Sequence, residues 1–250
     1  MKRFAIICKM ETILFLRDFF SIFFTLGFPA LMLVLFGSIY GNEPMYPGAD
    51  LGAMDASVPA YAVMVMGVTG LMAFPLTLAG YKEKKIYKRF DATPAGKGQI
   101  ILAQVLVNVA MTFAGIVLLL FLGKILYHTR MQGSIGSVCV SLVICISAMF
   151  SMGFLFTAIG RDAKITNLLC YLFYFVMLFL SGATIPDILF PESVKSVSRF
   201  LPMTHAVDLM QGVFAGEALS LHGTELLVLG AVTVLFTVAG AVLYQKKDWA

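Results

Sequence analysis

Apolar runs that alternate with short polar segments give this chain its organisation. Several runs reach the roughly 20 residues that a helix needs to cross the hydrocarbon core of a bilayer. The predicted spans are residues 19–40, 58–81, 100–127, 137–159, 168–180 and 226–244. Pro29 and Pro75 lie inside the first and second spans, where they predict kinks that neighbouring helices accommodate. The pattern predicts an all-α integral membrane protein with six transmembrane helices.

Three segments lie outside the spans, and the pattern predicts helices in the first and the third. Residues 1–18 mix apolar and charged positions and predict an N-terminal interfacial helix. Residues 82–99 form a basic, proline-broken loop between spans two and three. Residues 181–225 are moderately apolar but contain three prolines. They predict two short re-entrant helices on the external side, at about 191–200 and 204–215.

The composition excludes a soluble globular domain. Hydrophobic residues make up 60% of the chain and charged residues 13%, with a mean hydropathy of +0.91, so there is too little polar surface to cover a globule. The first apolar run continues past Phe19 without a small-residue cleavage site, and we expect no cleaved signal peptide. Residues 1–250 are interpreted as a single transmembrane domain.

Lysine and arginine are distributed unequally between the two predicted sides of the membrane. Of the eighteen basic residues, four fall on the predicted external side and the other fourteen on the cytoplasmic side; the external four are Lys124, Arg130, Lys195 and Arg199. This bias predicts that both termini are cytoplasmic. Because the basic residues border the spans, topology explains them better than nucleic-acid binding does.

The loop 82–99 holds six of the eighteen basic residues. They are Lys82, Lys84, Lys85, Lys88, Arg89 and Lys97. One interpretation is that the loop only fixes topology and meets lipid headgroups. Topology alone needs no Thr-Pro turn and no aromatic side chains among the charges, so a docking surface for an energy-supplying cytoplasmic partner is favoured.

Several kinds of chemistry have no signature in the sequence. There is no GxxxxGK[ST] phosphate loop, HExxH or GxSxG motif, so we expect no ATP hydrolysis and no catalytic site in this chain. Its histidines, His128, His205 and His222, are far apart, and its four cysteines lack CxxC spacing; neither set predicts a metal site. The spans have essentially no ionisable residues near their middles, which argues against an ion-coupled carrier and a membrane-embedded enzyme.

The basic loop resembles the cytoplasmic loop of the type 2 permeases of ATP-binding-cassette (ABC) transporters. In that family a Glu and basic residues open a short helix that ends near a Thr-Pro pair. The matching residues here are Glu83, Phe90, Thr93 and Pro94. Lys85 stands where the family often has a glycine, and Asp91 stands where an apolar residue is usual.

A second stretch resembles the external segment between the last two spans of the same family. It comprises residues 182–186, Phe190, Pro191, residues 200–205 and Asp208. Together with the order of the six spans, the two motifs extend the resemblance over nearly the whole chain.

The resemblance implies a permease subunit of an ATP-driven exporter. Its partners would be two cytoplasmic ATPase subunits, which carry the ATP and Mg²⁺, and a second permease half in a homodimer or related heterodimer. The chain itself would bind no cofactor. The resemblance also implies a bacterial inner or plasma membrane, outward transport and drug-like, peptide or lipid-like cargo. The alternative is a non-transporting assembly or anchoring protein that uses the same loop to recruit a cytoplasmic partner.

The resemblance also assigns two groups of site residues. The predicted ATPase-coupling residues, on a helix that presents Tyr87 and Phe90 to the ATPase, are Glu83, Lys84, Lys85, Tyr87, Phe90, Thr93 and Pro94. The predicted external gate, with bend points at Gly182 and Pro186, consists of Gly182, Pro186, Pro191, Pro202, Thr204 and His205.

An apolar pathway rich in Phe and Met suits hydrophobic or amphipathic cargo. Candidate side chains in the first and fourth spans are Phe19, Phe20, Phe23, Phe24, Met32, Met149, Phe150, Met152 and Phe154. Ordinary packing explains any single one of them better. GxxxG matches at 37–41 and 212–216 allow close helix contact, but neither is assigned to a dimer seam.

Overall fold

The computed structural model describes residues 2–43, 52–91, 96–185 and 190–246. Every regular element in these residues is helical. In chain order, the elements are α1 (Lys2–Arg17), α2 (Phe19–Ile22), η1 (Phe23–Gly27), α3 (Phe28–Tyr40), α4 (Ala53–Gly67), η2 (Val68–Ala73), α5 (Phe74–Glu83), α6 (Ile86–Asp91), α7 (Gly96–Tyr127), α8 (Ile135–Ile159), α9 (Ala163–Leu180), α10 (Glu192–Ser198), α11 (Pro202–Phe214), η4 (Leu219–Leu221) and α12 (Gly223–Lys246). Segments η1 and η2 are π-helical, and η4 is a 3₁₀ turn.

The prediction of six membrane-spanning helices is confirmed by length and composition. The six candidate spans are Phe19–Tyr40, Ala53–Glu83, Gly98–Tyr127, Ile135–Ile159, Ala163–Leu180 and Gly223–Tyr244. The second and fifth begin earlier than predicted, because polar side chains cap them. Asp55 accepts a hydrogen bond from the Gly52 amide at 3.0 Å, and Asp162 accepts one from the Ile165 amide at 2.8 Å.

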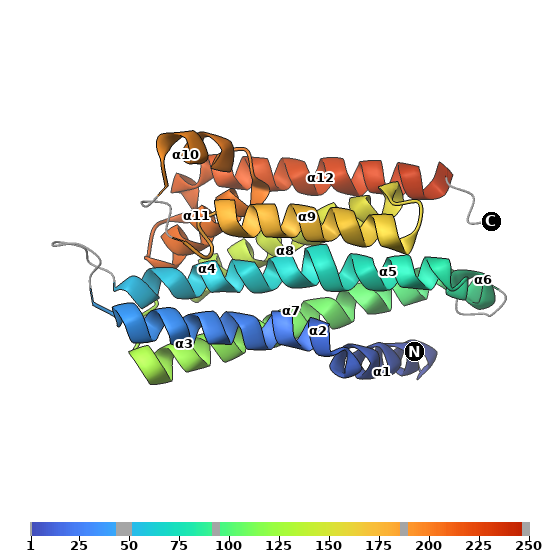
Figure 1. Ribbon diagram of the computed structural model, residues 1–250, viewed down its shortest axis with the longest axis horizontal. Helices are drawn as coiled ribbons and strands as arrows, with labels where there is room; N and C mark the ends of the chain where they lie inside the picture. The colour runs from blue at the N-terminus through green and yellow to red at the C-terminus, as the bar shows by residue number, and fades with distance from the viewer. Residues whose placement is uncertain (1, 44–51, 92–95, 186–189, 247–250) are drawn as a thin grey trace.

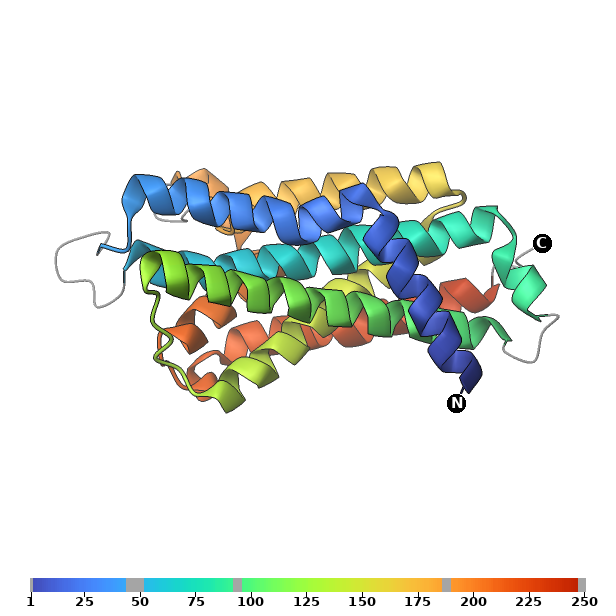
Figure 2. The ribbon, with the colours of Figure 1, turned by 90° about the horizontal axis from the view of Figure 1, so that it is seen from below.

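The spans lie side by side along one long axis (Figure 1). The helices α1 and α6 and the C-terminal part of α12 lie at one end, which we call the loop end. The helices α10 and α11 lie at the opposite end, which we call the cap end. Figure 2 shows α1 crossing α7 obliquely at the loop end. The segments that the sequence assigns to one side of the membrane therefore lie together.

The second span, formed by α4, η2 and α5, is enclosed by the other helices. In its apolar 18-residue stretch 89% of the residues are buried inside the protein, against 17% in the first span and 11% in the sixth. It packs against α3, α7, α8, α9 and α11. The outer spans thus leave their apolar faces uncovered, as helices surrounded by lipid do.

The expected disturbances near the span prolines are present as π-helical segments. Pro29 and Pro75 each stand at the second position of an α-helix that directly follows a π segment, η1 in the first span and η2 in the second. A proline lacks the amide proton of the helix ladder and its ring crowds the carbonyl four residues earlier. The wider π turn relieves that crowding without ending the helix.

A close approach of two backbones holds the second span against α8. A Cβ atom placed on Gly153 would lie 2.0 Å from the Gly70 carbonyl oxygen, and one placed on Gly70 would lie 2.8 Å from the Met149 backbone. Only glycine fits at this crossing. The GxxxG residues Gly37 and Gly212 instead face rings of the same chain, those of Tyr127 and His222, so their contacts lie within one chain.

The loop helix α6 begins three residues later than the family pattern suggests. Glu83 is the last residue of α5, and Lys84 and Lys85 form a turn before Ile86 opens α6. Lys85 adopts a left-handed backbone conformation with φ of 53°. Glycine enters this conformation without steric cost, which gives a physical reason for the glycine that resembling loops often carry here.

Replacing Gly153 with alanine should destabilise the bundle by about 1–3 kcal/mol, because the added methyl group meets the Gly70 carbonyl. The measurement is the thermal unfolding midpoint in detergent. Gly136→Ala in the same helix is the control, since no atom lies within 4 Å of its added Cβ. Equal midpoints for the two variants would contradict the proposed tight crossing.

Replacing Lys85 with glycine should stabilise the turn between α5 and α6 by up to about 1 kcal/mol, because it removes left-handed strain from a residue with a Cβ. Lys84→Gly should have the opposite effect, since Lys84 has φ of −75° and glycine only adds chain entropy there. Hydrogen exchange of the α6 amides measures both effects. Faster exchange in Lys85→Gly than in the parent would refute the assignment.

Candidate functional site

Charged side chains of the loop lie on the surface at the loop end. Glu83, Lys84, Lys85 and Arg89 are all exposed. Lys82 is only half-exposed, and its ammonium group donates to the Gly160 carbonyl at 3.3 Å. Because Gly160 lies in the connection between α8 and α9, this bond joins the end of the second span to a second connection at the same end.

Tyr87 differs from the sequence-based expectation that it is presented outward. Its side chain is 3% exposed, and its ring packs edge-on against Tyr81, with centroids 6.2 Å apart. Burial raises the pKa of the Tyr87 phenol, which stays neutral. The ring holds α6 against α5 and leaves the charged residues to face outward. The side chain of Phe90, and all of Thr93 and Pro94, lie outside the described residues.

The predicted external gate residues lie at the cap end. Gly182 has φ of 81° just after α9, Pro191 precedes α10 and Pro202 begins α11. The hydroxyls of Thr204 and Ser198 lie 3.1 Å apart, and Nε2 of His205 lies 2.9 Å from the Arg199 carbonyl oxygen. Pro186 lies outside the described residues.

The two short helices predicted for this segment are present as α10 and α11. One face of α11 is buried against α4, α8 and α12, and Gln211 donates to the Ala56 carbonyl at 3.0 Å. These contacts are those of a packing cap. A gating role for the segment stays a prediction.

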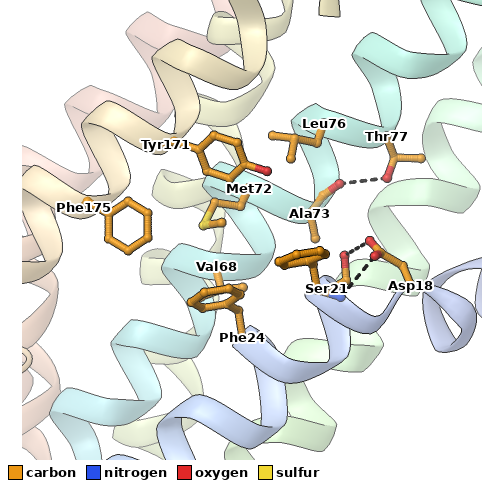
Figure 3. Close-up of a pocket in the computed structure, with 11 residues that line it drawn as sticks. Asp18, Ser21, Phe24, Val68, Met72, Ala73, Leu76, Thr77, Tyr171 and Phe175 are labelled. Atoms are coloured by element: carbon orange, nitrogen blue, oxygen red, sulfur yellow. Dashed lines mark hydrogen bonds between the residues drawn. The ribbon is translucent and has the colours of Figure 1, made fainter. Parts of the chain in front are cut away.

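A groove that the sequence analysis does not predict opens between the first, second and fifth spans (Figure 3). Its volume is about 410 Å³. The lining residues come from α2, η1, η2, α5, α9 and the junction before α2: Asp18, Phe20, Ser21, Phe24, Val68, Met72, Ala73, Leu76, Thr77, Tyr171 and Phe175. Among the candidate pathway residues, Phe20 and Phe24 line this groove, whereas Met149, Phe150 and Met152 are buried in the core.

The groove is polar at one edge and apolar elsewhere. Asp18 caps α2 by accepting from the Phe20 amide at 3.2 Å and from the Ser21 hydroxyl at 2.5 Å. Thr77 donates to the Ala73 carbonyl at 2.9 Å (Figure 3). The rest of the lining is mostly aliphatic and aromatic. Such a surface fits a molecule with one polar end and an apolar body.

A buried carboxylate at the loop end is the second feature that sequence reasoning missed. Glu11 of α1 is 2% exposed and accepts hydrogen bonds from Tyr81 and Gln104. One signal was available: Ile7, Glu11 and Phe15 are four residues apart and share a helix face. Two large apolar neighbours on that face indicate that the carboxylate points into protein.

No metal site is found among the described residues, where no group of three or more His, Cys, Asp or Glu side chains could hold an ion. The four cysteines are free thiols. His222 contacts Glu217 at 3.0 Å and Glu225 at 3.8 Å, and His205 lies apart on α11.

Comparison with known proteins agrees with this geometry. The family model described as ABC-2 type transporter matches residues 2–215. A search of the curated proteins gives no match. The matched region covers most of the chain and includes the loop, the groove and both helices of the cap. In this family the membrane domain is the permease part and ATP is hydrolysed by a separate subunit. The chain therefore belongs to the ABC-2 type transporter family.

Proposed function

We propose that this chain is the permease subunit of an ATP-driven exporter, paired with a second permease half and driven by two ATPase subunits docked on the loop. The observation that carries the proposal is the exposed charged surface of Glu83, Lys84, Lys85 and Arg89 at the end of an enclosed span. Association with ABC ATPase subunits is implied by the family.

The enclosed second span is suited to transmit a displacement of that charged surface into the membrane domain. A helix continuous through α4, η2 and α5 ends at Glu83, beside the loop. The Tyr81–Tyr87 contact and the bond from Lys82 to Gly160 tie the loop to this end. Because packed interiors resist compression, displacement of the loop would move the helix ends rather than be absorbed.

The groove supports a role as part of the cargo path. Its polar edge at Asp18, Ser21 and Thr77 and its apolar remainder favour amphipathic molecules, in the drug-like, peptide or lipid-like range. It lies on the outer surface of the chain, where the weakly buried first and fifth spans meet the enclosed second span. A second permease half packed over this face would complete it as a closed path.

The charge distribution supports placing the loop end in the cytoplasm of a bacterial cell. Thirteen of the fourteen basic residues assigned to that side belong to segments of the loop end, and the other, Lys247, lies outside the described residues. Outward transport follows the family's usual direction. A non-transporting anchor would use the same loop but would have no need of the groove. The transport experiment below therefore distinguishes an exporter from an anchor.

Reversing the charge of Lys84 and Lys85 together, with Lys84→Glu and Lys85→Glu, should weaken binding of the ATPase subunit roughly tenfold at low salt, with a smaller difference at high salt. Binding is measured by co-purification and by titrating the ATPase onto immobilised nanodiscs that contain the permease. Glu83→Ala should also weaken binding of the ATPase subunit in the same assay, because it removes the carboxylate next to the two lysines. Lys164→Glu is the control, being exposed at the same end but outside the loop. Binding like that of the parent in both loop variants would refute docking on this surface.

Filling the groove with Leu76→Trp should lower cargo transport roughly tenfold, the result of a steric cost near 1.4 kcal/mol on binding. Binding of the ATPase should be unchanged, because Leu76 lies inside the groove and away from the charged surface. Val176→Trp, on an exposed face of α9 outside the groove, is the control. Transport is measured as ATP-dependent accumulation of amphipathic dyes in inverted vesicles. Equal transport by both variants would argue against a cargo path here.

A further inference from the structure

Glu11 joins the N-terminal helix to the two helices that border the loop. Both carboxylate oxygens accept from the Tyr81 hydroxyl of α5, at 2.9 and 3.0 Å, and Oε2 also accepts from the Gln104 amide of α7. The helix α5 leads into the loop and α7 leaves it. No salt bridge to Glu11 occurs within the described residues. Its charge is balanced by neutral donors alone.

A line of buried polar residues continues from Glu11 along α7. Gln104, Asn108 and Thr112 are four residues apart, so they share one face of the helix. Asn108 donates to the Gln104 carbonyl at 2.9 Å and to its side-chain oxygen at 3.3 Å, and Thr112 donates to the Asn108 carbonyl at 2.8 Å. All three are at most 3% exposed.

The line ends at the π segment beside the groove. The Thr112 hydroxyl lies 2.7 Å from the Thr69 hydroxyl of η2. Thr69 is fully buried, and its neighbours Val68 and Met72 in η2 line the groove. Hydrogen bonds therefore connect α1 at the loop end with the wall of the groove, through the third span.

One acceptor in the line is left without a donor. The side-chain oxygen of Asn108 is buried and has no hydrogen-bond partner. A buried acceptor without a donor is costly, so an arrangement that brings a donor to this oxygen gains free energy. The line is thus suited to a change between two bonding patterns.

We propose that Glu11 is a positioning residue, which fixes α1 to α5 and α7 and, through Gln104, Asn108, Thr112 and Thr69, makes the state of the groove depend on the state of the loop. The inference rests on the proposed coupling through the loop. Glu11 touches neither the cargo groove nor the charged surface, and acts through the helices that carry them.

The contacts of Glu11 with Tyr81 and Gln104, which we call the latch, also have a pH readout. Burial raises the pKa of Glu11 above its ordinary 4.5, and the hydrogen bond from Tyr81 opposes this rise. The titratable groups facing it are the phenols of Tyr81 and Tyr87, since α7 presents neutral amides. The folded state therefore binds this proton more tightly than the unfolded state does. Stability falls as pH rises from about 4.5 through the raised pKa.

The experiment compares Glu11→Gln, Glu11→Ala and the control Lys9→Gln, which alters an exposed residue of the same helix. The permease alone is tested first, by hydrogen exchange of α1 and by thermal midpoints across pH. Glu11→Ala should expose α1 to exchange, because Tyr81 and Gln104 lose their acceptor. Glu11→Gln should keep much of the protection but lose the pH-dependent part of the midpoint. Unchanged exchange in Glu11→Ala, or unchanged pH dependence in Glu11→Gln, would overturn the latch.

The second part tests communication along the line, in the permease bound to its ATPase. Glu11→Gln and Thr69→Val should each reduce cargo moved per ATP by roughly fivefold or more. The double variant should lose less than the product of the two effects, since both break one network. Thr157→Val, a buried threonine of α8 outside the line, paired with Glu11→Gln should give the full product. If the double variant of Glu11 and Thr69 instead loses the full product of the two single effects, the link is wrong.

The two parts fail separately. If the parent permease shows no ATP-driven transport, the proposed function is wrong, while exchange and pH dependence of the isolated chain still report whether Glu11 holds α1. If the parent transports cargo but the losses of Glu11→Gln and Thr69→Val simply multiply in the double variant, the exporter proposal stands and the link through Thr69 is wrong.

Discussion

The backbone contact between Gly70 and Gly153 sets the depth at which the second span sits in the bundle. Lipid gives helices no hydrophobic reason to associate, so contact must come from close van der Waals packing, for which small residues are needed. With a Cβ at either position the helices would separate. The positions of η2 and of the loop at the end of α5 both follow from this crossing, because both belong to the span it holds.

The two π segments, η1 and η2, shape the wall of the groove. Pro29 and Pro75 cannot extend a regular ladder, and η1 and η2 absorb the mismatch in the turn before each. The same turns supply Phe24, Val68 and Met72 to the groove wall. A wider turn also redirects side chains, so Thr69 faces Thr112 and not lipid. The π segment before Pro75 thus holds both groove-lining side chains and the last residue of the polar line.

Much of the architecture was predictable, because hydropathy and length decide where a chain crosses a bilayer. Span ends were less so: Asp55 and Asp162 extend two helices through capping bonds that periodicity does not reveal. The family resemblance predicts that Tyr87 faces outward, yet its ring packs on Tyr81 across a turn. The groove draws on three spans distant in sequence. Features that depend on contacts between segments far apart in the chain could not be predicted from a single sequence.

The unequal burial of the spans limits how this chain can change shape. A span enclosed on all sides cannot shift without opening many contacts, whereas the first and fifth spans have only 17% and 28% of their apolar stretches buried. Few contacts within the chain therefore hold these two spans in place. The groove lies where these two spans meet the enclosed one. A change in its width therefore costs least when the first and fifth spans move relative to the second span, and the polar line joined to η2 connects the wall of the groove with α7 and α1.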